Sequence, residues 1–519
     1  MPVGNLFQTK LKKNMCMIKV NKNLFLILFV PLVLVHRYTN AQTSLPEKKL
    51  NFDEATMLAL QNNHSIKQVE YLKKQHEAET DAAKGLKMPN VGLTAGYFLL
   101  SDDIHLDLTP VKNAITPLYS ALSNYGNFSG VGSYPDAVST QIVRSQLAQG
   151  LQTINNTSWD ETIQKKNFGV VSATAAWPIY TGGKIKAAND AATIQQKEAD
   201  EVMKQKSGEL ISELADRYFG LCLAKQAVLV REDVLKGMND HLNDALKMEK
   251  QGLIAHADIL NAQVYQSEAE RELSKAKHTA DILNQALLNT LATDEQININ
   301  PQTELFYLDM IEPVDYFKTL AQKNNPLLQQ VQTKKELAYQ GLKAEQSSKY
   351  PSVAVQGMYN IVDQNYSPYM PTWMVGVGAK WTLFSGSSIN KKIKVAEYKT
   401  DQVKEAEQKA QSDVATVIDK LYRELQMYHE QLTQLTTTKK FAEEYVRVRE
   451  KAFHEDMSNA TEVVDARLAL SKVRIERLEA MYGYDKTLAQ LLQYAGIPEQ
   501  YSEYQKKANV VTESYQSAN

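Results

Sequence analysis

The sequence feature that most constrains the fold is a run without glycine or proline that extends from Ser387 to Tyr482. Glycine and proline are the residues that most often interrupt helices, and helices of globular proteins usually run for about 8 to 20 residues. A run of this length therefore predicts long helical rods with only short turns between them. The region between Pro178 and Pro301 also lacks proline, and it predicts a second set of rods.

An internal repeat relates the two regions. An offset of 262 residues aligns Asn62 with Asn324, and an offset of 204 residues aligns Trp177 with Trp381. The offset decreases from 262 to 204 residues because the first half contains extra residues before Trp177. Each half is predicted to run as helix, strand, loop, strand, long helix, turn and helix, and the first of these helices spans about residues 53–86 and 315–349.

The repeat predicts how the chain is divided. The expected segments are a signal peptide at 1–41, a first repeat at 42–292, a connector at mid-height at 293–313, a second repeat at 314–496 and a polar C-terminal tail at 497–519. The connector is expected to be irregular.

The N-terminus has the features of a secretory signal. Lysines precede the short apolar segment Leu24–Val35, and Ala41 provides a small residue for cleavage. The mature chain then keeps only Cys222 and can form no internal disulfide. An exported protein of this kind is typical of the Gram-negative envelope.

Helix lengths favour a barrel of helices. At 1.5 Å per residue, residues 185–248 form a helix of about 96 Å, whereas 255–292 and 53–86 give about 57 Å and 51 Å. Two shorter helices stacked end to end match one long helix, so a barrel of continuous and stacked helices is expected. The second rod carries apolar residues at alternating spacings of four and three, which predicts coiled-coil pairing with a neighbouring helix and not burial in a wide core. These residues are Val414, Ile418, Leu421, Leu425, Tyr428, Leu432 and Leu435.

Four segments of about ten residues have the alternation of membrane strands. In residues 373–383, apolar side chains alternate with small or polar ones, and the same pattern recurs near residues 91–97, 171–179 and 353–359. Alternation is more common in soluble sheets, but the signal peptide, the four copies and the aromatic ends favour the outer membrane. The aromatic residues expected at the lipid boundary are Tyr97, Trp177, Tyr359, Trp373 and Trp381.

Four strands cannot close a barrel, and an open edge in lipid leaves backbone groups unsatisfied. Three chains of four strands would give a shared barrel of twelve, above the minimum of eight. A trimer is therefore expected, although strand spacing alone would also allow a dimer.

Composition and motifs argue against other classes of function. The net charge of −2 and the pI of about 6.5 give no basic excess for nucleic acid. The nine histidines are scattered, and His454-Glu455 lacks the second histidine of a zinc helix. Neither a P-loop nor a nucleophile elbow is present, so no enzyme activity, catalytic residue, metal site or cofactor is expected.

Several segments of the chain resemble those of the TolC-like outer membrane efflux proteins. The resemblance rests on the repeated Asn-Asn pairs (62–63 and 324–325), on the segment Trp177–Gly183 and on Gly252 followed by Asp258-Ile-Leu-Asn-Ala-Gln. It implies a mainly helical chain with four membrane strands, which forms a homotrimeric tunnel with a twelve-stranded barrel in outer-membrane lipid and a long helical barrel in the periplasm. It also implies a periplasmic adaptor and an inner-membrane pump of the RND or ABC type as partners. The expected function is the exit duct of a tripartite efflux or type I secretion system. The alternative is a periplasmic coiled-coil adaptor or scaffold without membrane strands.

The resemblance assigns roles to the two turns at the far end of the helices. Residues implied to dock the adaptor are Gly252, Leu253, Ile254, Met457, Ser458 and Asn459; residues implied to form an acidic periplasmic gate are Glu462, Asp465, Asp258 and Asn261. An acidic helix face exposed to solvent is the commonest explanation for such pairs of carboxylates, and the family resemblance favours the gate. Residues 98–166 are expected to face outside, where they could narrow the mouth or bind other molecules.

Overall fold

The computed structural model describes residues 46–293, 295–455, 457–458 and 460–513. The expected signal peptide and the proposed docking residue Asn459 lie outside these residues. Residues from Pro46 onward form one compact unit.

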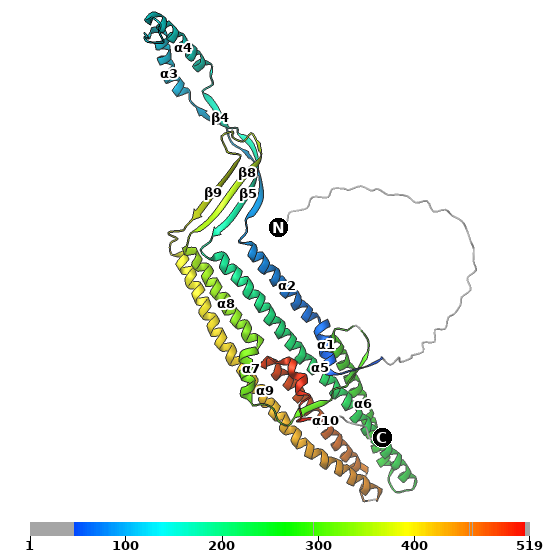
Figure 1. Cartoon of the computed structure of the whole chain (residues 1–519). Coiled ribbons are helices and arrows are strands. Elements are labelled where there is room, and N and C mark those ends of the chain that lie inside the picture. The colour runs from blue at the N-terminus through cyan, green and yellow to red at the C-terminus, as the bar shows by residue number, and fades with distance from the viewer. Residues whose placement is uncertain (1–45, 294, 456, 459, 514–519) are drawn as a thin grey trace, which may run out of the picture. The chain divides into compact units, whose positions relative to one another are not determined.

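Eight helices of the two repeats match one another in order and length (Figure 1). The first repeat contains α1 (Phe52–Asn62), α2 (His64–Gly85), α5 (Lys184–Lys250) and α6 (His256–Leu291), and the second contains α7 (Val314–Asn324), α8 (Pro326–Gln346), α9 (Ser388–His454) and α10 (Ala460–Ala495). The helices α5 and α9 have 67 residues each, so each is about 100 Å long. The shorter α6 and α10 pack along α5 and α9, and α8 lies between α5 and α9. Among the described residues, no helix combines the length and the apolar character needed to cross a membrane.

The first helix of each repeat is broken at the second asparagine of the Asn-Asn pair. The sequence predicted one continuous helix. Asn63, however, has an extended ψ of 131° and separates α1 from α2. Its side chain accepts the Ser65 N–H at 2.8 Å, and its Nδ2 donates to the Thr290 carbonyl at 2.9 Å. Asn325 repeats this arrangement, because its Nδ2 donates to the Tyr494 carbonyl at 2.7 Å. Each asparagine thus starts one helix and attaches it to the end of another.

The four predicted membrane strands form one antiparallel sheet. The strands β2 (Asn90–Leu99), β5 (Asn167–Tyr180), β8 (Ser352–Gln364) and β9 (Trp373–Lys380) are joined in the order β2-β5-β8-β9. Trp381, predicted within the last strand, lies one residue beyond its end. The apolar face of the sheet is uncovered, since Val91, Leu93 and Val377 are each more than 70% exposed.

The long segment between β2 and β5 is folded and is not a bare loop. A ribbon of β3 (Ile104–Asp107) and β4 (Asp160–Gln164) carries a hairpin of α3 (Thr109–Tyr125) and α4 (Asp136–Asn156). The hairpin lies beyond the end of the sheet that is away from the long helices (Figure 1).

The connector and the tail also contain regular structure. In the connector, β6 (Asn298–Pro301) pairs with β1 (Glu47–Leu50), and β7 (Leu305–Leu308) pairs with β10 (Val510–Glu513) of the tail. The strand β7 is buried throughout, and the tail buries Tyr501 and Tyr504. The expectation of an irregular connector is therefore wrong, because edge pairing with the two chain ends orders it.

The connector and the tail contribute to the main apolar core. The core cluster joins Phe306 of β7 and Tyr501 of the tail to α1, α5, α7, α9 and α10. Ile418, Leu421 and Leu425 of the predicted coiled-coil seam are buried in the same cluster. The prediction that the seam lies outside a wide core is wrong here, since α7, α10 and the connector cover it.

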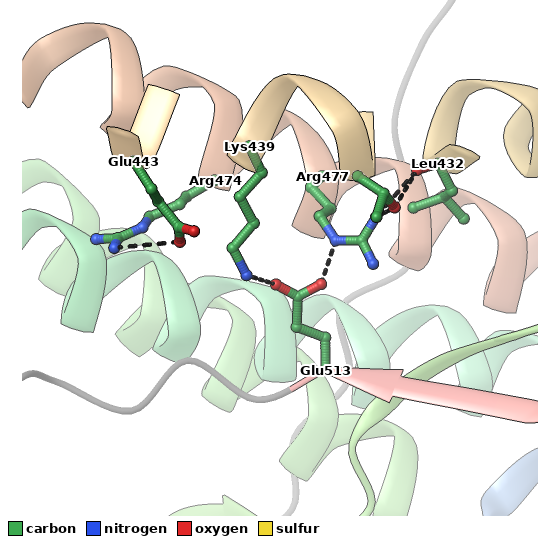
Figure 2. A network of polar contacts seen from close by, with 7 residues as sticks. Leu432, Lys439, Glu443, Arg474, Arg477 and Glu513 are labelled. Carbon is green, nitrogen blue, oxygen red and sulfur yellow. Dashed lines mark hydrogen bonds and ion pairs between the residues drawn. The ribbon is translucent and has the colours of Figure 1, made fainter. Parts of the chain in front are cut away.

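Ion pairs attach the C-terminal strand to the long helices (Figure 2). Glu513 of β10 accepts from the Lys439 Nζ at 2.6 Å and from the Arg477 Nε. Arg477, which is only 6% exposed, also donates to the Leu432 carbonyl at 3.0 Å. Burial by itself would raise the pKa of Glu513, but the two cationic donors outweigh it and lower that pKa.

Candidate functional site

The first candidate site is the turn between α5 and α6, which is closed by a glycine helix cap. The Gly252 N–H donates to the Glu249 carbonyl at 2.8 Å, and the Leu253 N–H donates to the Met248 carbonyl at 3.0 Å. Gly252 has a φ of +76°, which L side chains rarely adopt. This backbone conformation explains the glycine, because no atom lies within 4 Å of the position of an added Cβ. The cap leaves the Leu253 side chain 57% exposed at the tip.

The second turn, between α9 and α10, has equivalent backbone bonds. The Met457 N–H donates to the Ala452 carbonyl at 2.8 Å, at positions 204 residues after Leu253 and Met248. Met457 is 78% exposed. The two turns therefore present equivalent exposed apolar side chains, as expected for a docking surface. Ile254 and its equivalent Ser458 are only partly exposed.

The four residues predicted to form the gate differ in their local contacts. The Asp258 carboxylate accepts the Ala255 N–H at 3.1 Å and so caps the start of its own helix. The equivalent Glu462 accepts from the Arg449 Nη1 at 2.7 Å and from the Ser458 Oγ at 2.6 Å. Its charge is therefore paired with a cation of α9, which could not be predicted from the sequence.

The other pair of predicted gate residues lies one helical turn further along. Asn261 on α6 and Asp465 on α10 are both exposed. No ion pair within the described residues involves Asp465. Of the two predicted gate acids on α10, Asp465 is thus the more exposed one.

A contact between α5 and α10 joins the two helix pairs above the tips. Arg474 of α10 bonds Asp233 of α5 at 3.1 Å and approaches Glu443 of α9 at 3.8 Å (Figure 2 shows the second contact). Further down, Arg467 of α10 pairs with Glu450 of α9 at 2.6 Å. None of these residues was predicted from the sequence to make a contact between helices.

Glycine at position 237 allows the close approach of these helices. A Cβ added to Gly237 would lie 1.8 Å from the Arg467 Nη1. A glycine in the middle of a long helix costs about 1 kcal/mol relative to alanine, so it usually has a packing reason. Gly237 was therefore a signal in the sequence for this contact.

A buried histidine lies beside the same contact. His241 of α5 is 7% exposed, and its ring lies 5.2 Å from that of Phe453 on α9. Burial lowers the pKa of His241, and the positive charge of Arg467 lowers it further. The neutral ring is thus favoured where the two helix pairs meet.

Four of the five aromatic residues predicted at the lipid boundary lie near strand ends of the sheet. At the helix end, the Trp177 Nε1 donates to the Lys87 carbonyl at 3.0 Å, and the Trp381 Nε1 donates to the Lys349 carbonyl at 3.1 Å. At the other ends of their strands, Trp373 begins β9 and Tyr97 pairs with Gly169 near the end of β2. Tyr359 pairs with Trp373 and with Ala173, midway along β8 and β5. All five aromatic side chains are between 46% and 67% exposed, and they are Tyr97, Trp177, Tyr359, Trp373 and Trp381.

Comparison with known proteins identifies relatives for this arrangement. The family model described as "Outer membrane efflux protein" matches residues 144–293 and 319–497, which is more than half of the chain. A search of curated proteins found no match.

Solved structures share the fold at low sequence identity. The chain is similar to CusC with a TM-score of 0.65 and 12% identity, over 86% of this chain and 92% of that one. It is similar to the outer membrane protein VceC of Vibrio cholerae with a TM-score of 0.62 and 14% identity, over 86% and 96% of the two chains. It is also similar to the open state of the outer membrane channel MtrE of Neisseria gonorrhoeae, with a TM-score of 0.63 and 12% identity, over 86% and 89%.

Proposed function

The chain belongs to the outer membrane efflux protein family, and from that premise we propose that three copies form an exit duct from the periplasm through the Gram-negative outer membrane. Channels of this family work as trimers with adaptor and pump partners. The duct serves a tripartite efflux or type I secretion system, and an inner-membrane pump of the RND or ABC type supplies the energy.

The four-stranded sheet is the observation that carries this proposal. Its outer strands β2 and β9 each have a free edge within the described chain, and its apolar face is exposed. In lipid the backbone groups of both edges must be paired, which a neighbouring copy can do. Three copies give twelve strands, with the apolar side chains toward lipid and the small or polar ones toward water.

The spacing of the aromatic residues fits an outer membrane. Tyr97 is level with Gly169, which is eight residues along β5 from Trp177. These eight residues correspond to about 27 Å along a strand. For a strand tilted by about 40°, they correspond to roughly 20 Å across the membrane, and the apolar band of an outer-membrane barrel is about 25 Å tall.

The tips of the helices supply the docking surface and the gate. Leu253 and Met457, with Gly252, Ile254, Ser458 and Asn459 beside them, receive the periplasmic adaptor. Threefold symmetry turns Asp465 into a ring of three carboxylates at the periplasmic entrance, with Asn261 at the equivalent position of the other turn. Glu462 is held by Arg449 and Asp258 caps α6, so both contribute less charge to the ring.

Two neighbouring substitutions in β9 test the membrane assignment. Val377→Arg places a charge on the apolar face of β9 between Trp373 and Trp381, where lipid disfavours it by up to about 2–4 kcal/mol per chain. Gly376→Arg places the same charge on the opposite face, where no atom lies within 4 Å of an added Cβ. We expect Val377→Arg to reduce the amount of trimer recovered from outer membranes far more than Gly376→Arg does. Equal recovery of the two variants would contradict the assignment of the faces.

The alternative function, a periplasmic adaptor without membrane strands, receives no support from the family match. It predicts that the folded protein is recovered from the soluble periplasm. The same fractionation therefore separates the two functions.

A further inference from the structure

The helix α3 has two apolar stripes, and α4 covers only one of them. Ile115, Tyr119 and Leu122 are partly buried toward α4, where Tyr119 lies against Gly150. The second stripe is exposed along its whole length. It consists of Val111 (49% exposed), Ala114, Leu118 (57%), Ala121 and Tyr125 (81%).

The exposed stripe has the spacing of a coiled-coil seam. Its members follow one another at intervals of three, four, three and four residues, and large side chains alternate with alanine. A repeat of 3.5 residues keeps one seam facing a partner helix over several turns. Within the described residues, α3 has an extended contact only with α4. No other element of the described residues covers this stripe, and a second copy of the chain can do so.

Charge favours a second copy over a lipid surface. The 48 residues from Thr109 to Asn156 contain only three charged side chains, Lys112, Asp136 and Arg144, whereas 23% of the whole chain is charged. The buried centres of protein interfaces are depleted of charge, while helices that lie on lipid carry a strongly charged face. With Lys112 as its single charge, α3 has no such face.

Apolar matching favours another α3 over the outer face of α4. The exposed stripe of α4 includes Gln141, Ser145 and Gln152, which would leave polar groups opposite an apolar seam. A threefold axis relates identical helices in parallel, so that three identical apolar seams can face one another. The hairpin also follows β2 along the chain, and β2 is the edge strand that adjoins the neighbouring copy in the proposed barrel.

We propose that the α3 stripes of three chains pack against one another around the threefold axis, so that the hairpins form a helical collar that narrows the outer mouth of the duct. This inference rests on the proposed trimer. It gives the long insertion a structural partner, which is two further copies of the same helix.

Cysteine cross-linking in the assembled protein tests the contact. Leu118→Cys lies in the middle of the α3 stripe and Ser145→Cys in the α4 stripe, and both are made with Cys222→Ser to remove the other cysteine of the mature chain. A short bismaleimide added to cells should link Leu118→Cys chains in pairs, at least tenfold more than Ser145→Cys chains. Equal or absent linking in trimers verified by native electrophoresis would overturn the collar. Absence of a trimer in the unsubstituted protein would instead contradict the proposed function.

A second measurement tests the narrowed mouth. Gly376→Cys places a thiol on the face of β9 that is directed toward the lumen, and a bulky polyethylene-glycol maleimide added outside must pass the mouth to reach it. Replacing residues 109–156 by a short turn should accelerate labelling at least tenfold. An unchanged rate in an intact trimer, or protection of Leu118→Cys from water-soluble maleimide by lipid, would overturn the proposal.

Discussion

Asn325→Ala should destabilise the fold by about 2–4 kcal/mol, because the asparagine has two separate functions. Its Oδ1 accepts the Leu327 and Leu328 N–H groups at 2.9 and 3.2 Å and so caps α8, and loss of such a cap costs about 1 kcal/mol. Its Nδ2 donates to the Tyr494 carbonyl, and an unsatisfied buried carbonyl costs about 1–3 kcal/mol more. Asn325 is 2% exposed, so water cannot replace either bond.

The preceding residue provides a matched control. Asn324 is exposed at the end of α7, and Asn324→Ala should change stability by less than about 0.5 kcal/mol. Asn325→Asp keeps the capping oxygens but loses the donor, so it separates the two contributions. The measurement is the urea midpoint of the helical circular dichroism of the purified trimer in detergent. Equal midpoints for Asn324→Ala and Asn325→Ala would refute the assignment of the helix break to the second asparagine.

Two further predictions concern the tips. Asp465→Ala should raise the single-channel conductance in planar bilayers, because it removes the proposed ring of three exposed carboxylates. Asn261→Ala, at the equivalent position of the other turn, should leave the conductance unchanged. The same conductance for both variants would argue against an acidic gate. The contact at His241 should weaken as the pH falls below about 6.5, because the folded pKa is lowered and the unfolded or separated state binds the proton more readily. Hydrogen exchange of α5 near His241 at pH 7.5 and 5.5 measures this effect, and in His241→Gln the pH dependence should disappear. The charged groups that face the histidine are Arg467, Asp244, Asp240, Lys247 and Glu450.

Patterns that repeat along the sequence predicted most of the fold. The absence of proline predicted α5 and α9, and alternation predicted the four strands. These signals are local, because helix and strand periodicity record which face of an element is buried.

Features that depend on distant partners were not predictable in this way. Arg449 lies 13 residues before Glu462, and only the closed turn brings the two side chains together. The connector strands are four residues long, and their order comes from pairing with the chain ends. The α3 stripe lies in a segment that was expected to be a loop. Pro110 lies in the first turn of the helix, which continues through Pro117.

The repeat separates residues that hold the fold in both halves from residues that differ between the halves. Features that hold the fold occur in both halves with the same chemistry, as with Asn63 and Asn325, whose side chains make the same two kinds of bond. The tips keep the same backbone bonds but differ in side chains, so that asparagine at position 261 corresponds to aspartate at 465. A proposed trimer of such chains presents six turns with equivalent backbone bonds at its periplasmic end, and the three α9–α10 turns carry an exposed aspartate at the position where the three α5–α6 turns carry Asn261. Since the shared backbone supports asparagine in one turn and aspartate in the other, the charge of Asp465 is not needed to form the turn, which supports the proposal that it serves the gate.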